Sequence, residues 1–323
     1  MNQMPDKITG LKVGDLYPLD PAVGQHKLNM ALHLFEKWHG AEDGRITCLF
    51  GPQGPDMLDK GLLLEIKALA EKYDTMIHMH VAQGDREIHQ MVKRYNQRSI
   101  QWLDEIGYLD QRLLAVHLTE ATREETQLLA KRGASMILCS GSIGIIDGIV
   151  PPAAEFLEVS HRLALGSDQA PGNNCNNMFN EMKFTAILNK CKAKDPRPFP
   201  AWRVLRLATS DGARAIGLGD EIGSLKPGKK ADIILVDLNK PALCPAIFQP
   251  VSNVVPNLVY SATGSEVDTV IIDGRVIMDQ GKLTTVDEAL AIQEAHRQGR
   301  LVAEAAQLGN QNIMALMQAN NQL

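Results

Sequence analysis

Three short apolar segments of this chain each carry, at or next to their C-terminal end, a side chain that can bind a metal ion. In chain order they are Ile77-His78-Met79-His80-Val81, Val116-His117-Leu118 and Leu165-Gly166-Ser167-Asp168. A catalytic divalent metal takes a few neutral imidazoles and a carboxylate and keeps one position open for water. It lowers the pKa of that water to about 7, and a nearby carboxylate accepts the proton. A single such histidine is more often structural, but three such ends favour a metal site.

The elements that must position these side chains alternate along the chain. Short apolar runs of strand length are followed by amphipathic stretches of helix length. We predict strands at 46–50, 75–81, 113–118, 134–139 and 163–166, and helices at 61–73, 85–106, 123–132, 151–156, 177–190 and 202–216. Repeated strand–helix units imply parallel strands joined by right-handed crossovers.

The position of the polar residues favours one α/β architecture. Gln53, His80, His117, Ser140 and Asp168 all lie at the C-terminal ends of predicted strands, and in a TIM-like (β/α)8 barrel that face carries the active site. A doubly wound open sheet is the alternative, but its Gly-rich phosphate turn is absent from the sequence. Only five strands precede the last of these residues, or six with 8–13, so we expect the first barrel strands to be missing.

The character of the chain changes near residue 217. Turn-rich and short β-segments with hairpin signals follow, among them Asp273-Gly274. We predict three parts: a partial metal-hydrolase barrel at 1–216, half of a small β-sandwich at 217–285, and a C-terminal helix with its tail at 286–323. The helix, expected at 287–308, carries apolar residues at three-to-four spacing.

Composition excludes several classes of function. The 323 residues carry a formal net charge of −5 and no block of like charge, so neither nucleic acid nor membrane is an expected partner. Five scattered cysteines predict a reducing, cytoplasmic setting rather than a disulfide framework. The N-terminal stretch has no signal-peptide core, and no run approaches the roughly 18 apolar residues of a membrane helix.

Further motifs link these strand ends to a known family. The sequence resembles the amidohydrolase superfamily, in the branch of chlorohydrolases and aromatic deaminases that includes triazine hydrolases, guanine and cytosine deaminases, and methylthioadenosine/adenosylhomocysteine deaminases. The resemblance extends from about residue 45 to 287. Besides the three strand ends, it rests on Leu138-Cys139-Ser140-Gly141-Ser142, Asn173-Asn174, Ala208-Thr209, Gly212-Ala213-Arg214-Ala215, Gly223-Ser224-Leu225-Lys226-Pro227-Gly228-Lys229-Lys230-Ala231-Asp232, Val259-Tyr260 and Val270-Ile271-Ile272-Asp273-Gly274-Arg275.

The resemblance implies a role for each strand end. His80 would be the metal ligand of the fifth strand, and His117 the second histidine ligand or the residue that polarises the substrate. Asp168 would bind the metal and shuttle the proton of the attacking water. The metal would be zinc, with iron as the alternative, and the reaction a hydrolytic loss of ammonia, an amine or chloride from a nitrogen heterocycle. A homodimer is expected from the family and the long C-terminal helix.

The chain departs from the family pattern in two places. The His-x-His pair of the first family strand is absent, and His78-x-His80 is not that pair, which suggests an N-terminally truncated chain with too few ligands for tight metal binding. Gln83 stands where deaminases of this branch carry the Glu that protonates a ring nitrogen. We expect Gln83 to hydrogen-bond the substrate; the alternative is that Asp85 or Glu87 supplies a proton.

The loop after Asp168 is rich in asparagine, whose amides pair well with heterocycle edges. We predict that Gln83, Ser140, Asn173 and Asn174 bind substrate and that Asp168, His117 and Gln83 take part in catalysis. The competing interpretation of an Asn here is a helix cap. A Ser–His–Asp hydrolase is disfavoured because no G-x-S-x-G elbow occurs.

Three hypotheses about function follow from the sequence. The first is the metal-dependent hydrolase of a purine-, pteridine- or triazine-like ring. The second is a non-catalytic fragment, motivated by the missing strands, because an open half-barrel exposes sheet edges and apolar faces. The third keeps the superfamily but changes the reaction to dechlorination or cyclic amide opening, because Gln83 has no acidic proton to give.

Overall fold

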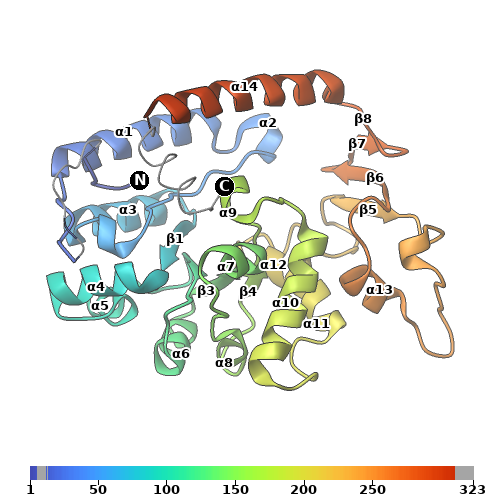
Figure 1. The fold of residues 1–323 in the computed structure, drawn as a ribbon, viewed down its shortest axis with the longest axis horizontal. Coiled ribbons are helices and arrows are strands. Elements are labelled where there is room, and N and C mark those ends of the chain that lie inside the picture. Colours follow the sequence, from blue (N-terminus) through green and yellow to red (C-terminus); the bar gives the residue numbers. More distant parts are fainter. Residues whose placement is uncertain (6–11, 13, 310–323) are drawn as a thin grey trace.

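The computed structural model describes residues 1–5, 12 and 14–309 and contains two separate sheets (Figure 1). A parallel sheet with helices lies in the first two-thirds of the chain, and a small antiparallel sheet follows it. The parallel part comprises α1 (Pro21–Trp38), α2 (Ala41–Gly44), η1 (Pro55–Met57), α3 (Lys60–Lys72), β1 (Ile77–Val81), α4 (Gly84–Tyr95), α5 (Ser99–Glu105), β2 (Leu113–His117), α6 (Arg123–Lys131), β3 (Ser135–Leu138), α7 (Ser140–Ile146), α8 (Ala153–Leu157), β4 (Leu163–Leu165), α9 (Ala170–Asn173), α10 (Met178–Ala193), α11 (Ala201–Leu207) and α12 (Ser210–Ala215).

The parallel sheet has its strands in chain order, β1-β2-β3-β4. Its register pairs Met79 with Ala115, Ala115 with Met136, and Met136 with Leu163. Consecutive strands that are neighbours, each joined through helices, are the arrangement from which a (β/α)8 barrel is built. The alternation in the sequence therefore predicted the α/β class and the parallel pairing correctly. Within the described residues the sheet is open rather than closed.

The two faces of this sheet have different environments. Ile77, Met79, Ala115 and their neighbours on one face are buried in the large core formed with the surrounding helices. The other face carries Leu114 and Val116, which belong to a smaller buried cluster. His80 alternates with the core residues of β1 and therefore lies on this second face, which would line the interior of a barrel.

Two predicted elements were wrong in extent. The strand expected at 46–50 is reduced to a single bridge between Phe50 and Ile77, because no described strand pairs with its outer side. The helix expected at 85–106 is two helices, α4 and α5, since Asn96 ends α4 in the left-handed region with φ 54°. The possible strand at 8–13 falls mostly outside the described residues.

The helix expected at 202–216 is likewise divided. Thr209 leaves the helical region with φ −131° and ψ −101°, which separates α11 from α12. By contrast, α6 was predicted correctly from 123 onward, because Thr122 and Glu125 form a reciprocal capping box at its N-terminus.

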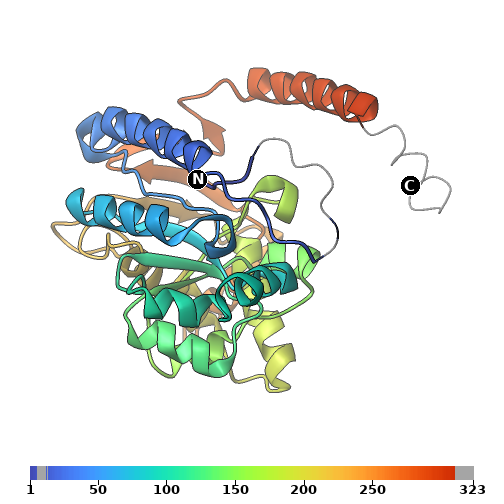
Figure 2. The same ribbon diagram turned by 90° about the vertical axis from the view of Figure 1, so that its left-hand side faces the viewer.

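The C-terminal part forms one antiparallel sheet of order β5-β6-β7-β8, rather than the two layers of a complete sandwich. Large apolar side chains remain exposed on it, including Ile234 and Leu235 at 50% and 52%. The helix expected at 287–308 is α14, which lies apart from the sheets (Figure 2), and its side chains are exposed as far as residue 306. The elements are β5 (Ile233–Val236), η2 (Pro241–Leu243), α13 (Val254–Tyr260), β6 (Val267–Ile272), β7 (Arg275–Asp279), β8 (Lys282–Leu283) and α14 (Glu288–Gly309).

Within the described residues, no helix has both the length and the apolar character needed to cross a membrane.

Candidate functional site

A cavity of about 400 Å³ lies at the carboxyl ends of β1 and β2. The predicted residues His80, Gln83, His117 and Asp168 all line it. Side chains from η1, from α4 and from the loop after β4 complete its wall; the lining residues are Gln53, Gly54, Asp56, Met57, His80, Gln83, Arg86, Glu87, His117, Ile146, Asp168 and Gln169. The fold therefore brings four residues from three segments that are far apart in the sequence to one concave site, as expected at this end of a parallel sheet.

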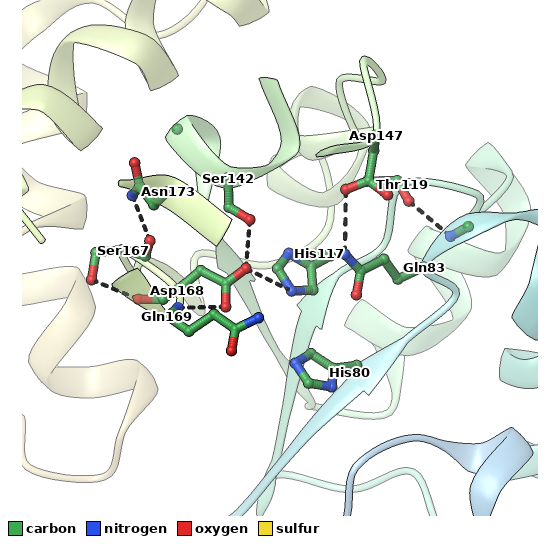
Figure 3. Close-up of polar contacts among 12 residues, drawn as sticks. His80, Gln83, His117, Thr119, Ser142, Asp147, Ser167, Asp168, Gln169 and Asn173 are labelled. Atoms are coloured by element: carbon green, nitrogen blue, oxygen red, sulfur yellow. Dashed lines mark hydrogen bonds and ion pairs between the residues drawn. The ribbon is translucent and has the colours of Figure 1, made fainter. Parts of the chain in front are cut away.

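His80 is oriented by the backbone of the neighbouring segment. Its Nδ1 lies 2.7 Å from the carbonyl oxygen of Gln53, which is a hydrogen bond when Nδ1 carries the proton. That tautomer leaves the Nε2 lone pair free, which is how a metal-binding histidine is usually held. The ring stacks on that of His117, with 5.3 Å between centroids (Figure 3).

His117 ends β2 and is 1% exposed. Its backbone has φ 75°, and Leu118 follows with φ 56°. Positive φ in two consecutive non-glycine residues is strained and is concentrated at functional sites. Burial, and then the nearby imidazole of His80, lower the pKa of His117 to about 4. The ring is therefore neutral at pH 7, and its buried Nδ1 has no hydrogen-bond partner among the described residues.

Asp168 follows β4 with φ 63°. Its Oδ2 lies 3.7 Å from Nε2 of His117 and accepts a hydrogen bond from the Ser142 hydroxyl at 2.5 Å. The backbone N–H of Gln169 donates to Oδ1 at 2.6 Å (Figure 3). Partial burial favours the neutral acid, but the two hydrogen bonds and the neighbouring imidazoles together lower the pKa of Asp168. A neutral imidazole thus faces an ionised carboxylate, which is not an ion pair at pH 7.

The chemistry of these donors fits a divalent metal. His80 presents a free Nε2, His117 is neutral, and Asp168 is ionised, which are the protonation states that metal ligation requires. The set is not assembled as a ligand sphere, however, because no three His, Cys, Asp or Glu side chains of the described residues lie close enough to hold one ion. The ligand assignment of His80, His117 and Asp168 therefore stays a prediction.

Gln83 is held between two carboxyl groups. Its side-chain amide donates to Asp147 Oδ2 at 3.3 Å, and its backbone N–H donates to Glu87 Oε2 at 3.1 Å. Glu87 also accepts from the Ala82 backbone N–H at 2.7 Å and from the Ser99 hydroxyl. Burial, and then the nearby Asp56 carboxylate, raise the pKa of Glu87 to about 7. Glu87 thus fixes the turn that places Gln83 at the cavity.

The other predicted substrate-binding residues do not line the cavity. Ser140 is buried, with its hydroxyl 2.7 Å from the Thr185 hydroxyl. The Asn173 amide donates to the Ser167 carbonyl oxygen at 2.5 Å and to Glu181 Oε1 at 2.7 Å. Asn174 is exposed and ends α9 in the left-handed region. Their contact with substrate stays a prediction.

Two residues of the site have roles that the sequence did not predict. Ser142, the third residue of α7, holds Asp168, whereas the sequence showed it only in a Ser-Gly-Ser motif after a predicted strand. Asp56 is 1% exposed and lines the cavity. Its burial depends on the packing of η1 against α4 and α5, which leaves no periodic signal in the sequence.

The chain is similar in sequence to known proteins of one family. A family model described as "Amidohydrolase family" matches residues 17–277. Within that family, the chain is 36% identical over 269 residues to the 5-methylthioadenosine/S-adenosylhomocysteine deaminase of Desulforudis audaxviator, covering 83% of this chain and 61% of the relative. It is 34% identical over 288 residues to the 5'-deoxyadenosine deaminase of Methanosphaera stadtmanae, covering 89% and 66%.

The chain therefore belongs to the amidohydrolase family, as its motifs predicted. It spans about three-fifths of the length of the curated relatives that it matches first.

Solved structures agree with the fold. An adenosine deaminase from Xanthomonas campestris with bound zinc superposes with a TM-score of 0.80 at 32% identity, covering 89% of this chain and 63% of that one. An atrazine chlorohydrolase from Arthrobacter aurescens, complexed with zinc, gives a TM-score of 0.78 at 20% identity, covering 92% and 64%. At that identity the second similarity shows the fold alone.

Proposed function

We propose that this protein acts as a metal-dependent hydrolase that removes an amino, alkylamino or chloro group from a nitrogen heterocycle. The observation that carries the proposal is the convergence of His80, His117 and Asp168 on one cavity, with 3.7 Å between His117 Nε2 and Asp168 Oδ2. The 32–36% identity to adenosine-type deaminases makes an aminopurine nucleoside the first substrate to test.

The proposed chemistry divides into what the metal supplies and what the residues do. His80, His117 and Asp168 would hold a zinc ion, or iron, and the ion when bound supplies a water of lowered pKa. Asp168, kept ionised by Ser142 and the Gln169 backbone, accepts the proton of the attacking water. His117, neutral and buried, can then donate a hydrogen bond to the substrate or complete the ligand set. Water adds to the ring carbon, and the proton held by Asp168 passes to the departing nitrogen, which leaves as ammonia or an amine; chloride instead leaves as the anion and the proton goes to solvent.

Gln83 favours a second candidate reaction. Its amide cannot protonate a ring nitrogen, which a deaminase needs, whereas displacement of chloride needs less help for the leaving group. A cyclic amide opening is compatible for the same reason. The Gln83 amide would then hydrogen-bond the substrate edge while Asp147 fixes its orientation.

The experiment measures ammonia and chloride release side by side, from adenosine and from atrazine, with the chain loaded with zinc or iron. The first proposal predicts ammonia release that is lost in Asp168→Ala and kept in Asp279→Ala, an exposed aspartate of β7. Chloride release without ammonia release supports dechlorination rather than deamination. Release of neither product refutes loss of ammonia and of chloride from these two probes and leaves cyclic amide opening and the non-catalytic hypothesis. The expected homodimer is tested separately, by light scattering.

A further inference from the structure

The cavity wall contains a buried carboxylate that the proposed chemistry does not use. Asp56 lies on η1, and its side chain is 1% exposed. Its Oδ2 has no hydrogen-bond partner among the described residues. Buried polar atoms are nearly always paired, so an unpaired one at a cavity wall needs an explanation. An unpaired buried carboxylate is also costly to the folded state.

The neighbouring arginine does not satisfy this oxygen. Arg86 Nη2 is 3.7 Å from Asp56 Oδ2, which is longer than a hydrogen bond. Its guanidinium lies 5.9 Å from the centre of the Tyr17 ring, and its side chain is 55% exposed. Arg86 therefore stands at the rim of the cavity and leaves Oδ2 of Asp56 without a hydrogen-bond partner.

Glu87, the other carboxyl group on this wall, is already satisfied. It accepts from the Ala82 and Gln83 backbone N–H groups and from the Ser99 hydroxyl. Two adjacent buried carboxyl groups thus differ, since Glu87 is fully bonded and structural while Asp56 lines the cavity with a buried oxygen that has no partner among the described residues. That contrast indicates that Asp56 is kept for a ligand rather than for the fold.

We propose that Asp56 is a ligand-recognition residue, whose Oδ2 accepts a hydrogen bond from an N–H or O–H group of a heterocyclic ligand that is not anionic. The exclusion of anions follows from the acidic groups of the wall, where Asp56 and Asp168, and Glu87 once it has lost its proton near pH 7, face one guanidinium, that of Arg86. A nucleoside has N–H and O–H donors of this kind. A nucleotide also carries a phosphate, which these carboxyl groups would repel. The inference rests on the proposed function only in taking the cavity as the substrate site.

The test measures binding by isothermal titration calorimetry on the full chain, without added metal, so that it does not depend on turnover. The probes are adenosine and adenosine 5'-monophosphate. We expect the wild type to prefer adenosine, and Asp56→Ala and Asp56→Asn to bind it on the order of tenfold more weakly, as expected for a lost hydrogen bond to a charged group. Asp59→Asn is the matched control, because Asp59 caps α3 and does not line the cavity.

A second readout separates recognition from a structural role. If Asp56 is kept for a ligand, Asp56→Asn melts no lower than the wild type, since it removes a charge beside Glu87 and loses no hydrogen bond at Oδ2. A lower melting temperature for Asp56→Asn, unchanged adenosine binding, tighter binding of the nucleotide, or binding of neither probe each overturns the inference. Adenosine binding without ammonia release would instead refute the proposed reaction alone.

Discussion

The Glu87→Gln substitution should remove most of the pH dependence of the free energy of unfolding that arises from the buried Glu87 carboxyl group. Glu87 is buried and accepts hydrogen bonds from the Ala82 and Gln83 backbones and the Ser99 hydroxyl. Burial, and then the Asp56 carboxylate, raise its pKa from 4.5 to about 7. The folded state therefore holds a proton on Glu87 at pH values where the unfolded chain has released it.

The direction and magnitude of this pH dependence of stability follow from the difference between the folded and unfolded pKa values of Glu87. Because the folded pKa is the higher one, the stabilisation is complete below pH 4.5 and is lost as the pH rises through about 7. The gap between the two pKa values corresponds to ~3 kcal/mol of unfolding free energy. Glutamine does not titrate, so Glu87→Gln should lack this loss. The variant also forfeits one backbone hydrogen bond, because only one side of its amide can accept, and this costs ~1 kcal/mol at every pH.

Urea unfolding at pH 4.5, 6 and 7.5 measures the effect. The free energy of unfolding of the wild type minus that of Glu87→Gln should fall by ~3 kcal/mol between the lowest and highest pH. Glu71→Gln is the control, since Glu71 is exposed on α3. A difference between Glu87→Gln and wild type that stays constant across this range would show that the Glu87 pKa is the same in the folded and unfolded states, contrary to this prediction.

Two substitutions on α7 test the surroundings of Asp168. A Cβ added at Gly141 would lie 2.5 Å from Glu181 Oε1, so Gly141→Ala should lower the free energy of unfolding by ~1–3 kcal/mol through overpacking. Gly144→Ala is the control, because a Cβ at Gly144 meets open space, and it should not lower the melting temperature. Equal melting temperatures of the two variants would contradict this prediction. Ser142→Ala removes the hydroxyl that bonds Asp168 Oδ2 and should raise the pKa of that carboxyl, moving the pH midpoint of zinc binding upward. An unmoved midpoint would show that the hydroxyl does not tune Asp168.

The fold class could be predicted from the sequence because short, mainly apolar strands alternate with amphipathic stretches of helix length. The run at 113–118 became β2, ending at His117, one residue shorter than expected. The run at 46–50 is equally apolar but lacks a second neighbour, and only Phe50 pairs. The amino-acid composition of a segment does not indicate whether a partner strand lies beside it. The end of α4 at Asn96 was similarly hidden, because the amphipathic pattern continues through it.

The candidate site was readable where it depends on strand ends. His80, His117 and Asp168 lie at the carboxyl ends of strands that are neighbours or near neighbours in the sheet, so they line one cavity. The position of Asn173 in the sequence did not indicate its contacts, because its amide hydrogen-bonds to Glu181 and to a carbonyl oxygen within the protein. Asp56 was missed because its burial arises from packing between distant segments.

Metal analysis of the purified chain beside Asp168→Ala shows whether these strand ends bind a catalytic metal. After exposure to zinc or iron and removal of free metal, we expect near-stoichiometric metal in the wild type and its loss in the variant. Metal absent from both, or retained equally in both, would contradict this expectation.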